Sequence, residues 1–163
     1  MKTSLLLQLT VATLLMGCLS NQNKTAGYYN YKTECLGVEM DGSQTLKVWG
    51  SGRNHLDALE QAKKNGVRDV LFKGITDGKP ECNMKPVVPE VNAQEKYEDY
   101  FNKFFADNGP YKNFISYEDA SRIQPEIIKS KERAATQVTY RTTIRVHRSE
   151  LKEQMIKDGI LKN

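Results

Sequence analysis

The hydrophobic residues after residue 30 recur with a period of two in some stretches and with a helical period in others. A period of two is typical of strands with one buried face. It occurs on both sides of the turn pair Asp41–Gly42 and again at residues 122–128 and 137–147, which predicts two hairpins, the second joined by residues 131–134. The early strands have these inward residues: Leu36, Val38 and Met40, then Leu46, Val48 and Gly50.

The helical period predicts a long helix from about His55 to Lys73, with Asn54 as its N-cap. Small residues recur along its inner face: Ala58, Ala62 and Gly66. Such a face lets a helix lie close on a sheet. A short last helix is expected after Ser149, which would cap it, and Gly159 would end it.

Prolines interrupt the pattern between Ile75 and Val91 and predict an extended loop. A further helix is expected between Asn92, its cap together with Glu95, and the stop at residues 108–110. Its aromatic residues form one stripe: Tyr97, Tyr100, Phe101, Phe104 and Phe105. Because amphipathic helices normally bury such a face, we expect the stripe to be core. If the core were full without it, the stripe would be the leading partner-binding surface.

These elements predict a single α+β domain over residues 31–163. We expect an antiparallel sheet of about four strands. A long Ala-rich helix would pack on this sheet, with an inserted aromatic helix and a short C-terminal helix beside it. The sequence contains no internal repeat and no boundary of a second domain.

Residues 1–17 have the pattern of an export signal. Lys2 is followed by an apolar stretch at residues 5–15, shorter than the about 20 residues of a membrane span. The stretch ends at Leu15-Met16-Gly17-Cys18, which resembles the lipobox of bacterial lipoproteins, where the cysteine receives a diacylglycerol and becomes the new N-terminus. We therefore expect lipidation at Cys18, with an ordinary secretory signal as the alternative.

Residues 18–30 form a polar tether between this cysteine and the domain, and the first acidic residue after Cys18 is Glu34. By resemblance to Gram-negative lipoproteins, the lack of Asp after the cysteine implies the outer membrane, and the lack of an acidic run implies its periplasmic side. Each buried methylene of an acyl chain contributes about 0.8 kcal/mol, so a multiply acylated cysteine holds a protein on a bilayer without a spanning helix.

With Cys18 acylated, Cys35 and Cys82 remain in a compartment that permits disulfides. We expect them to pair, which would stabilise the domain by about 4 kcal/mol in the chain-entropy model. Two free buried thiols are one alternative, and metal ligation together with His55 and His147 is another. These four residues lack the short spacing of zinc sites, so we expect no metal and no cofactor.

Composition excludes a multi-span membrane protein and a low-complexity chain, with 39% hydrophobic and 27% charged residues and a net charge of +4. The charge is polarised, because residues 129–163 carry nine basic and four acidic residues, a net +5. The candidate binding residues there are Arg141, Arg145 and Arg148. They could meet anionic lipid, a glycan polymer or an acidic protein, and a solvated, internally paired surface is an equal alternative. An exported, tethered protein meets little nucleic acid, so we expect no nucleic-acid partner.

The sequence contains no recognisable catalytic motif. A nucleophile-and-base enzyme needs a positioned histidine, and neither His55 nor His147 lies in a nucleophile motif. Gly50-Ser51-Gly52 precedes a helix but lacks the third glycine of the dinucleotide fingerprint and the Lys-Ser/Thr of a P-loop. We interpret it as a plain strand-to-helix turn.

The order of elements resembles a known family. It comprises the strand Leu46-Lys47-Val48-Trp49-Gly50-Ser51-Gly52, the helical Asp57-Ala58-Leu59-Glu60-Gln61-Ala62, a late strand over residues 138–146 and a C-terminal helix. This order is similar to the small lipoprotein family named for a twenty-kilodalton bacterial membrane-associated lipoprotein, whose core is similar to the N-terminal domain of the flagellar assembly protein T. The resemblance covers residues 45–160 and implies an α+β interaction module of the envelope that catalyses no reaction. The proline loop and the aromatic helix look like an insertion beyond that core.

We therefore expect a non-enzymatic outer-membrane lipoprotein that faces the periplasm and binds an envelope protein. The alternative is a binding module for cell-wall glycan or anionic lipid, which would use the basic C-terminal face of Arg141, Arg145 and Arg148. A small envelope hydrolase is the third hypothesis.

Overall fold

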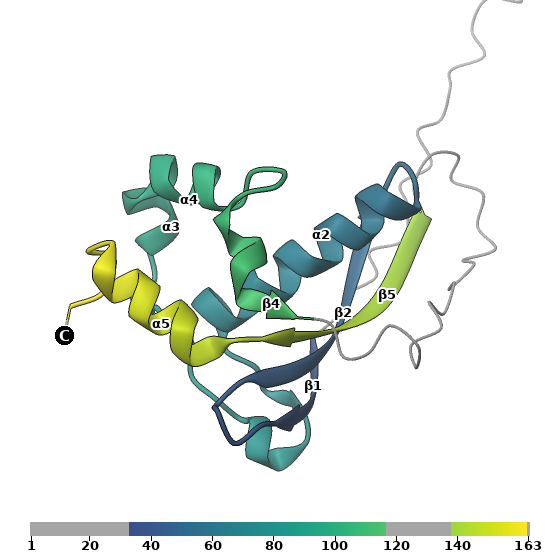
Figure 1. Ribbon diagram of the computed structural model, residues 1–163, viewed down its shortest axis with the longest axis horizontal. Coiled ribbons are helices and arrows are strands. Elements are labelled where there is room, and N and C mark those ends of the chain that lie inside the picture. The colour runs from purple at the N-terminus through teal and green to yellow at the C-terminus, as the bar shows by residue number, and fades with distance from the viewer. Residues whose placement is uncertain (1–32, 117–137, 163) are drawn as a thin grey trace, which may run out of the picture.

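The computed structural model describes residues 33–116 and 138–162. One sheet lies at the centre, with α2 along one of its faces and with α3, α4 and α5 toward one end (Figure 1). The elements have these bounds: β1 Glu34–Val38, β2 Gln44–Gly52, α2 His55–Arg68, a π-helical turn Asp69–Lys73, β3 Asp77–Gly78, a 3₁₀ turn Pro80–Cys82, α3 Ala93–Lys96, α4 Glu98–Phe104, a 3₁₀ turn Pro110–Phe114, β4 Ile115–Ser116, β5 Val138–Val146 and α5 Arg148–Lys157. The fold is α+β, as predicted. No helix among the described residues is long and apolar enough to cross a membrane.

The sheet is mixed and has five strands in the order β3-β1-β2-β5-β4. The pairs β1–β2, β2–β5 and β5–β4 are antiparallel, whereas β3 runs parallel to β1. The prediction of a purely antiparallel sheet is therefore wrong in this respect. The predicted strand at residues 122–128 and its connection at residues 131–134 lie outside the described residues.

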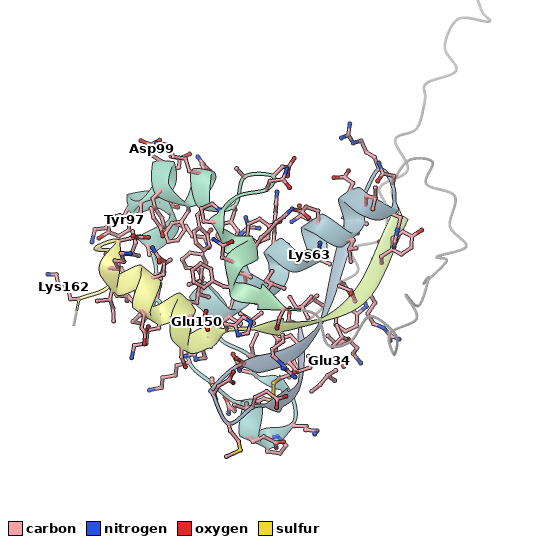
Figure 2. The ribbon with its side chains drawn as sticks, in the orientation of Figure 1. Glu34, Lys63, Tyr97, Asp99, Glu150 and Lys162 are labelled. Atoms are coloured by element: carbon pink, nitrogen blue, oxygen red, sulfur yellow. A yellow bond between two sulfur atoms is a disulfide. The ribbon has the colours of Figure 1, made fainter. Side chains whose placement is uncertain are left out.

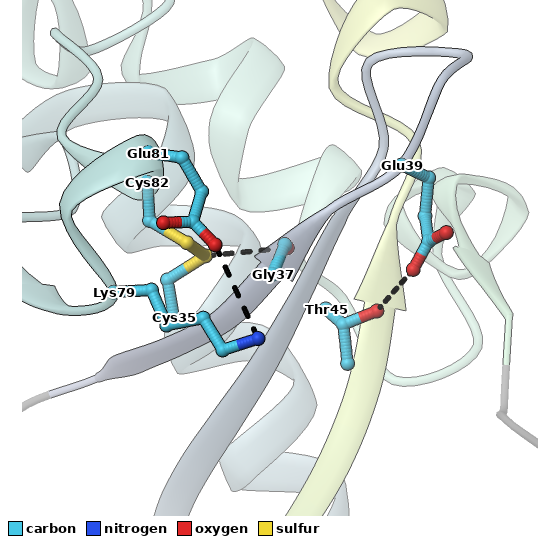
Figure 3. Close-up of a disulfide and its surroundings, with 7 residues drawn as sticks. All are labelled: Cys35, Gly37, Glu39, Thr45, Lys79, Glu81 and Cys82. Carbon is cyan, nitrogen blue, oxygen red and sulfur yellow. Dashed lines mark hydrogen bonds and ion pairs between the residues drawn. A yellow bond between two sulfur atoms is a disulfide. The ribbon is translucent and has the colours of Figure 1, made fainter.

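The disulfide accounts for the parallel strand that the sequence pattern does not indicate. Cys35 and Cys82 are bonded, with Cα atoms 5.8 Å apart (Figure 3). This bond brings the proline-rich loop beside β1, where Gly78 pairs with Cys35. Gly78 has a φ of 110°, and a Cβ atom there would lie 2.1 Å from the Cys35 carbonyl oxygen. Because only glycine permits this approach, the loop can contribute a two-residue strand.

The first hairpin turns at Asp41–Gly42 as predicted, with Gly42 at a φ of 81°. The inward face predicted for β1 is wrong for Leu36 and Met40, which are exposed, whereas Val38 packs against the core. A bulge at Leu36 shifts the register of β1 against β2, so Cys35 lies on the core side opposite Leu46. Met40 lies in the turn itself.

The helix α2 packs on the sheet through small residues. Its N-cap is Asn54, as predicted, because the Asn54 side chain accepts a hydrogen bond from the Asp57 N–H at 3.0 Å. The small residues of its inner face are buried: Ala58, Ala62 and Gly66. A Cβ atom on Gly50 would lie 2.2 Å from backbone atoms of α2, and one on Gly52 would lie 2.5 Å from them. Strand and helix are therefore in direct backbone contact.

Two helix ends differ from the prediction. The helix predicted to reach Lys73 is α-helical only to Arg68 and continues as the π-helical turn. The helix α5 begins at Arg148, so Ser149 lies inside its first turn and is not its cap. The Ser149 hydroxyl instead donates a hydrogen bond to the Asp41 carbonyl oxygen at 3.2 Å. Ser149 thus joins α5 to the first hairpin turn.

The predicted aromatic helix is broken at Tyr97 into α3 and α4. The expected cap with Glu95 is wrong, because Asn92 has a φ of −97° and a ψ of 17° and its side chain caps nothing. The phenylalanines of the stripe are buried: Phe101, Phe104 and Phe105. Tyr97 and Tyr100 are partly exposed, and the Tyr100 hydroxyl donates a hydrogen bond to the Asp158 carboxylate at 2.6 Å. The stripe is therefore mostly core and joins α4 to α5.

We predict that Gly50→Ala destabilises the domain strongly. The added methyl group would meet backbone of α2, which moves less readily than a side chain, so we expect a loss of roughly 3 kcal/mol in the free energy of unfolding. Urea unfolding followed by circular dichroism measures this loss. Gly37→Ala is the matched control, because a Cβ there would meet only the Lys79 Nζ, at 4.0 Å. Equal losses in the two variants would contradict the close contact of α2 with β2.

We also predict that reduction of the Cys35–Cys82 bond costs about 4 kcal/mol of stability, since it opens a loop of 47 residues. Urea unfolding with and without reductant measures the cost. The double variant Cys35→Ala, Cys82→Ala is the control and should not respond to reductant. Alkylation and mass spectrometry that found both thiols free in the non-reduced protein would contradict the disulfide.

Candidate functional site

The two central strands carry a polar and aromatic surface on the side of the sheet away from α2. Side chains alternate along a strand, so burial of Leu46, Val48 and Ile144 against α2 directs their neighbours to the opposite side. Figure 2 shows Glu34 of β1 on this side of the sheet and Lys63 of α2 on the other. We call this surface the outer face, and its residues are Lys47, Trp49, Ser51, Thr139, Arg141, Thr143 and Arg145.

Cross-strand pairing fixes the positions on the outer face. Trp49 lies directly across from Arg141, and Lys47 lies across from Thr143. The Lys47 Nζ lies 5.5 Å from the centroid of the Trp49 ring, within the range of a cation–π interaction. Ser51 and Thr139 share a hydrogen bond of 2.7 Å between their hydroxyl oxygens. The outer face thus combines the single tryptophan of the chain with basic and hydroxyl groups on two rigid strands.

Two carboxylates of the first hairpin lie at the margin of the outer face, and Figure 3 shows one of them, Glu39, beside Thr45. Glu34 forms an ion pair with Lys47, and Glu39 lies 3.6 Å from the Arg145 guanidinium. Such partly exposed pairs contribute about 0–1 kcal/mol each, so they can exchange for pairs with another molecule at little cost. The outer face is therefore suited to an acidic ligand that replaces Glu34 or Glu39.

The structure separates the three predicted basic residues. Arg141 and Arg145 share the outer face, but the strand ends at Val146, and Arg148 begins α5. The Arg148 Nη2 donates a hydrogen bond to the Lys85 carbonyl oxygen at 2.8 Å, while its Nη1 is buried without a hydrogen-bond partner among the described residues. Burial lowers the pKa of the Arg148 guanidinium. Of the three predicted residues, Arg141 and Arg145 therefore lie on the outer face and Arg148 does not.

A cluster of Asp41, Ser43 and His147 escapes sequence reasoning, because Ser43 and His147 are 104 positions apart. The Ser43 Oγ lies 3.2 Å from the His147 Nδ1, and the Asp41 carboxylate accepts the Ser43 N–H at 2.8 Å. This backbone hydrogen bond is the main cause of the lowered pKa of Asp41. These residue types occur in hydrolases, but Ser43 is 2% exposed and Asp41 contacts Ser43 instead of orienting the histidine. The geometry is that of a link between the hairpin turn and β5.

The other residues that the sequence analysis considered are Cys18, the histidines and the possible metal ligands. Cys18 and the tether lie outside the described residues. His55 contacts the ring of Tyr140 at a centroid distance of 4.4 Å. Within residues 33–116 and 138–162, no group of three or more His, Cys, Asp or Glu side chains is placed to hold a metal ion.

Comparison of the chain with protein-family models, with curated proteins and with solved structures finds no match. The class of protein is therefore defined by the fold and the outer face alone. It is a small α+β domain with a helix on one face of its sheet and a basic, aromatic surface on the two central strands of the other face.

Proposed function

We propose that the protein is a non-enzymatic lipoprotein of the outer membrane that faces the periplasm and binds an acidic envelope protein through the outer face. The observation that carries this proposal is the placement of Trp49 between Lys47 and Arg141 on the two central strands. Membership of the small lipoprotein family that the sequence resembles is part of this proposal.

The residue types of the outer face favour a protein partner. Tryptophan and arginine are the side chains that most often dominate the energy of protein interfaces. Both stand here on β2 and β5, which pair with each other over nine residues, so little conformational entropy is lost when a partner binds. Basic residues around the tryptophan would steer an acidic partner to the surface and set its orientation.

The proposed anchor is compatible with this use of the domain. Fully extended, the tether of residues 18–30 reaches at most about 45 Å from the membrane, at roughly 3.5 Å per residue. The domain then begins at β1, next to the strand that carries Trp49. An acylated Cys18 would therefore hold the outer face within a few nanometres of the bilayer and leave it accessible to periplasmic partners.

We predict that a photo-cross-linker in place of Thr143, within the outer face, captures one discrete envelope protein in cells. Charge reversal by Arg141→Glu should reduce this cross-link at least about tenfold, because an acidic partner would then be repelled. Two controls are matched: a cross-linker in place of exposed Lys152 on α5 should capture no such product, and Lys152→Glu should leave the Thr143 cross-link unchanged.

Equal cross-linking from both positions, or a Thr143 cross-link that survives Arg141→Glu, would contradict the protein-binding function. The alternative function, binding of cell-wall glycan or anionic lipid, has a separate readout. Sedimentation with purified glycan or with anionic vesicles would then be lost in Arg141→Glu while the protein cross-link is absent.

We predict that Cys18→Ser releases the protein from the membrane fraction into the periplasmic extract. The substitution removes the acceptor of the acyl chains, and no spanning helix among the described residues would replace it. Fractionation and immunoblotting measure the release, with Ser20→Ala in the tether as the control that stays membrane-bound. Retention of the Cys18→Ser protein on the membrane after signal cleavage would contradict the anchor.

A further inference from the structure

A second surface feature lies apart from the outer face. It is an open hollow of about 430 Å³ between the end of α2 and the helices α3 and α4. The residues that line it are Arg68, Gln94, Glu95, Glu98, Phe101, Asn102 and Phe105. Its volume lies within the range of about 300–1,000 Å³ found for small-molecule sites. The hollow is therefore large enough for a small ligand.

The charges of the hollow are of both signs and are not paired with each other. The Arg68 guanidinium lies 4.8 Å from the centroid of the Phe105 ring, which holds it in place. Among the described residues, the side chains of Arg68, Glu95 and Glu98 take part in no hydrogen bond and no ion pair.

Acidic residues elsewhere near α2 do form pairs. The Glu60 carboxylate lies 2.8 Å from the Lys112 Nζ, and the Asp107 carboxylate lies 2.6 Å from the Lys64 Nζ. In the hollow, by contrast, a cation and two carboxylates line one depression and do not pair with each other. Their arrangement offers a positive and a negative end to a ligand of matching size.

We propose that this hollow binds a free α-amino acid with an apolar side chain. Its carboxylate would accept hydrogen bonds from the Arg68 guanidinium, and its ammonium group would donate to Glu98 and Glu95. Phe101 and Phe105, which are 5% and 8% exposed, also line the hollow and would contact the apolar side chain. A purely anionic or purely cationic ligand would satisfy one end of the hollow and be repelled by the other, so the zwitterion is favoured.

The test is an NMR titration of the isotope-labelled full chain in detergent micelles with L-leucine. We expect saturable shift changes at Arg68, Glu98 and the residues between Gln94 and Phe105. N-acetyl-L-leucine lacks the ammonium group and L-leucinamide lacks the carboxylate, so each should bind at least roughly tenfold more weakly. Absence of saturable changes with L-leucine, or equal binding of either analogue, would overturn the proposal.

Substitutions in the hollow provide the second readout. Arg68→Gln and Glu98→Gln should each weaken L-leucine binding roughly tenfold or more. Glu98 is exposed, so its variant is expected to keep the fold. Asp99→Asn is the matched control on α4, because Asp99 projects outward and does not line the hollow (Figure 2). Unchanged binding in Glu98→Gln, or an equal loss in Asp99→Asn, would overturn the assignment.

Discussion

The contact between α2 and β2 is the constraint on which the rest of the structure depends. Because Gly50 and Gly52 carry no side chain, the helix backbone lies directly on the strand, and Ala58 and Ala62 fit against it. This approach buries Leu46 and the neighbouring apolar residues completely and gives the sheet one dry face. The same contact determines the site, because the alternation of β2 then directs Lys47, Trp49 and Ser51 to the opposite face. The contact between α2 and β2 therefore determines both the core and the outer face.

The disulfide holds the proline loop against the edge of the sheet. The chain between Cys35 and Cys82 contains α2 and the start of the proline loop, and the disulfide ties this loop to β1 in addition to the loop's backbone hydrogen bonds. With the bond formed, Gly78 joins β1 as a parallel strand, and Val87 and Val88 donate backbone hydrogen bonds to the carbonyl oxygens of Val70 and Leu71. The bond thus completes one edge of the sheet and also fixes the end of α2, next to which the charged hollow lies.

Sequence reasoning succeeded where the cause of a structure is local. Asn54 caps α2 because its own side chain reaches the Asp57 N–H, and Gly42 turns the hairpin because it accepts a positive φ. It failed where the cause is tertiary. The bulge at Leu36 follows from the need to place Cys35 inward, and β4 exists only because its residues pair with the end of β5, so neither has a periodic signal.

The candidate site shows the same division. The alternation of residues 137–147 correctly placed Arg141 and Arg145 on one face, but a count of charges cannot tell a cation that is available to a ligand from one that is used inside the fold. Arg148 holds the Lys85 carbonyl, and Arg145 lies beside Glu39, so much of the positive charge of the C-terminal segment serves internal contacts. Specificity of the outer face must then come less from net charge than from geometry. The flat Trp49 ring lies beside cations, and the paired strands that carry them cannot change register without exposing the core.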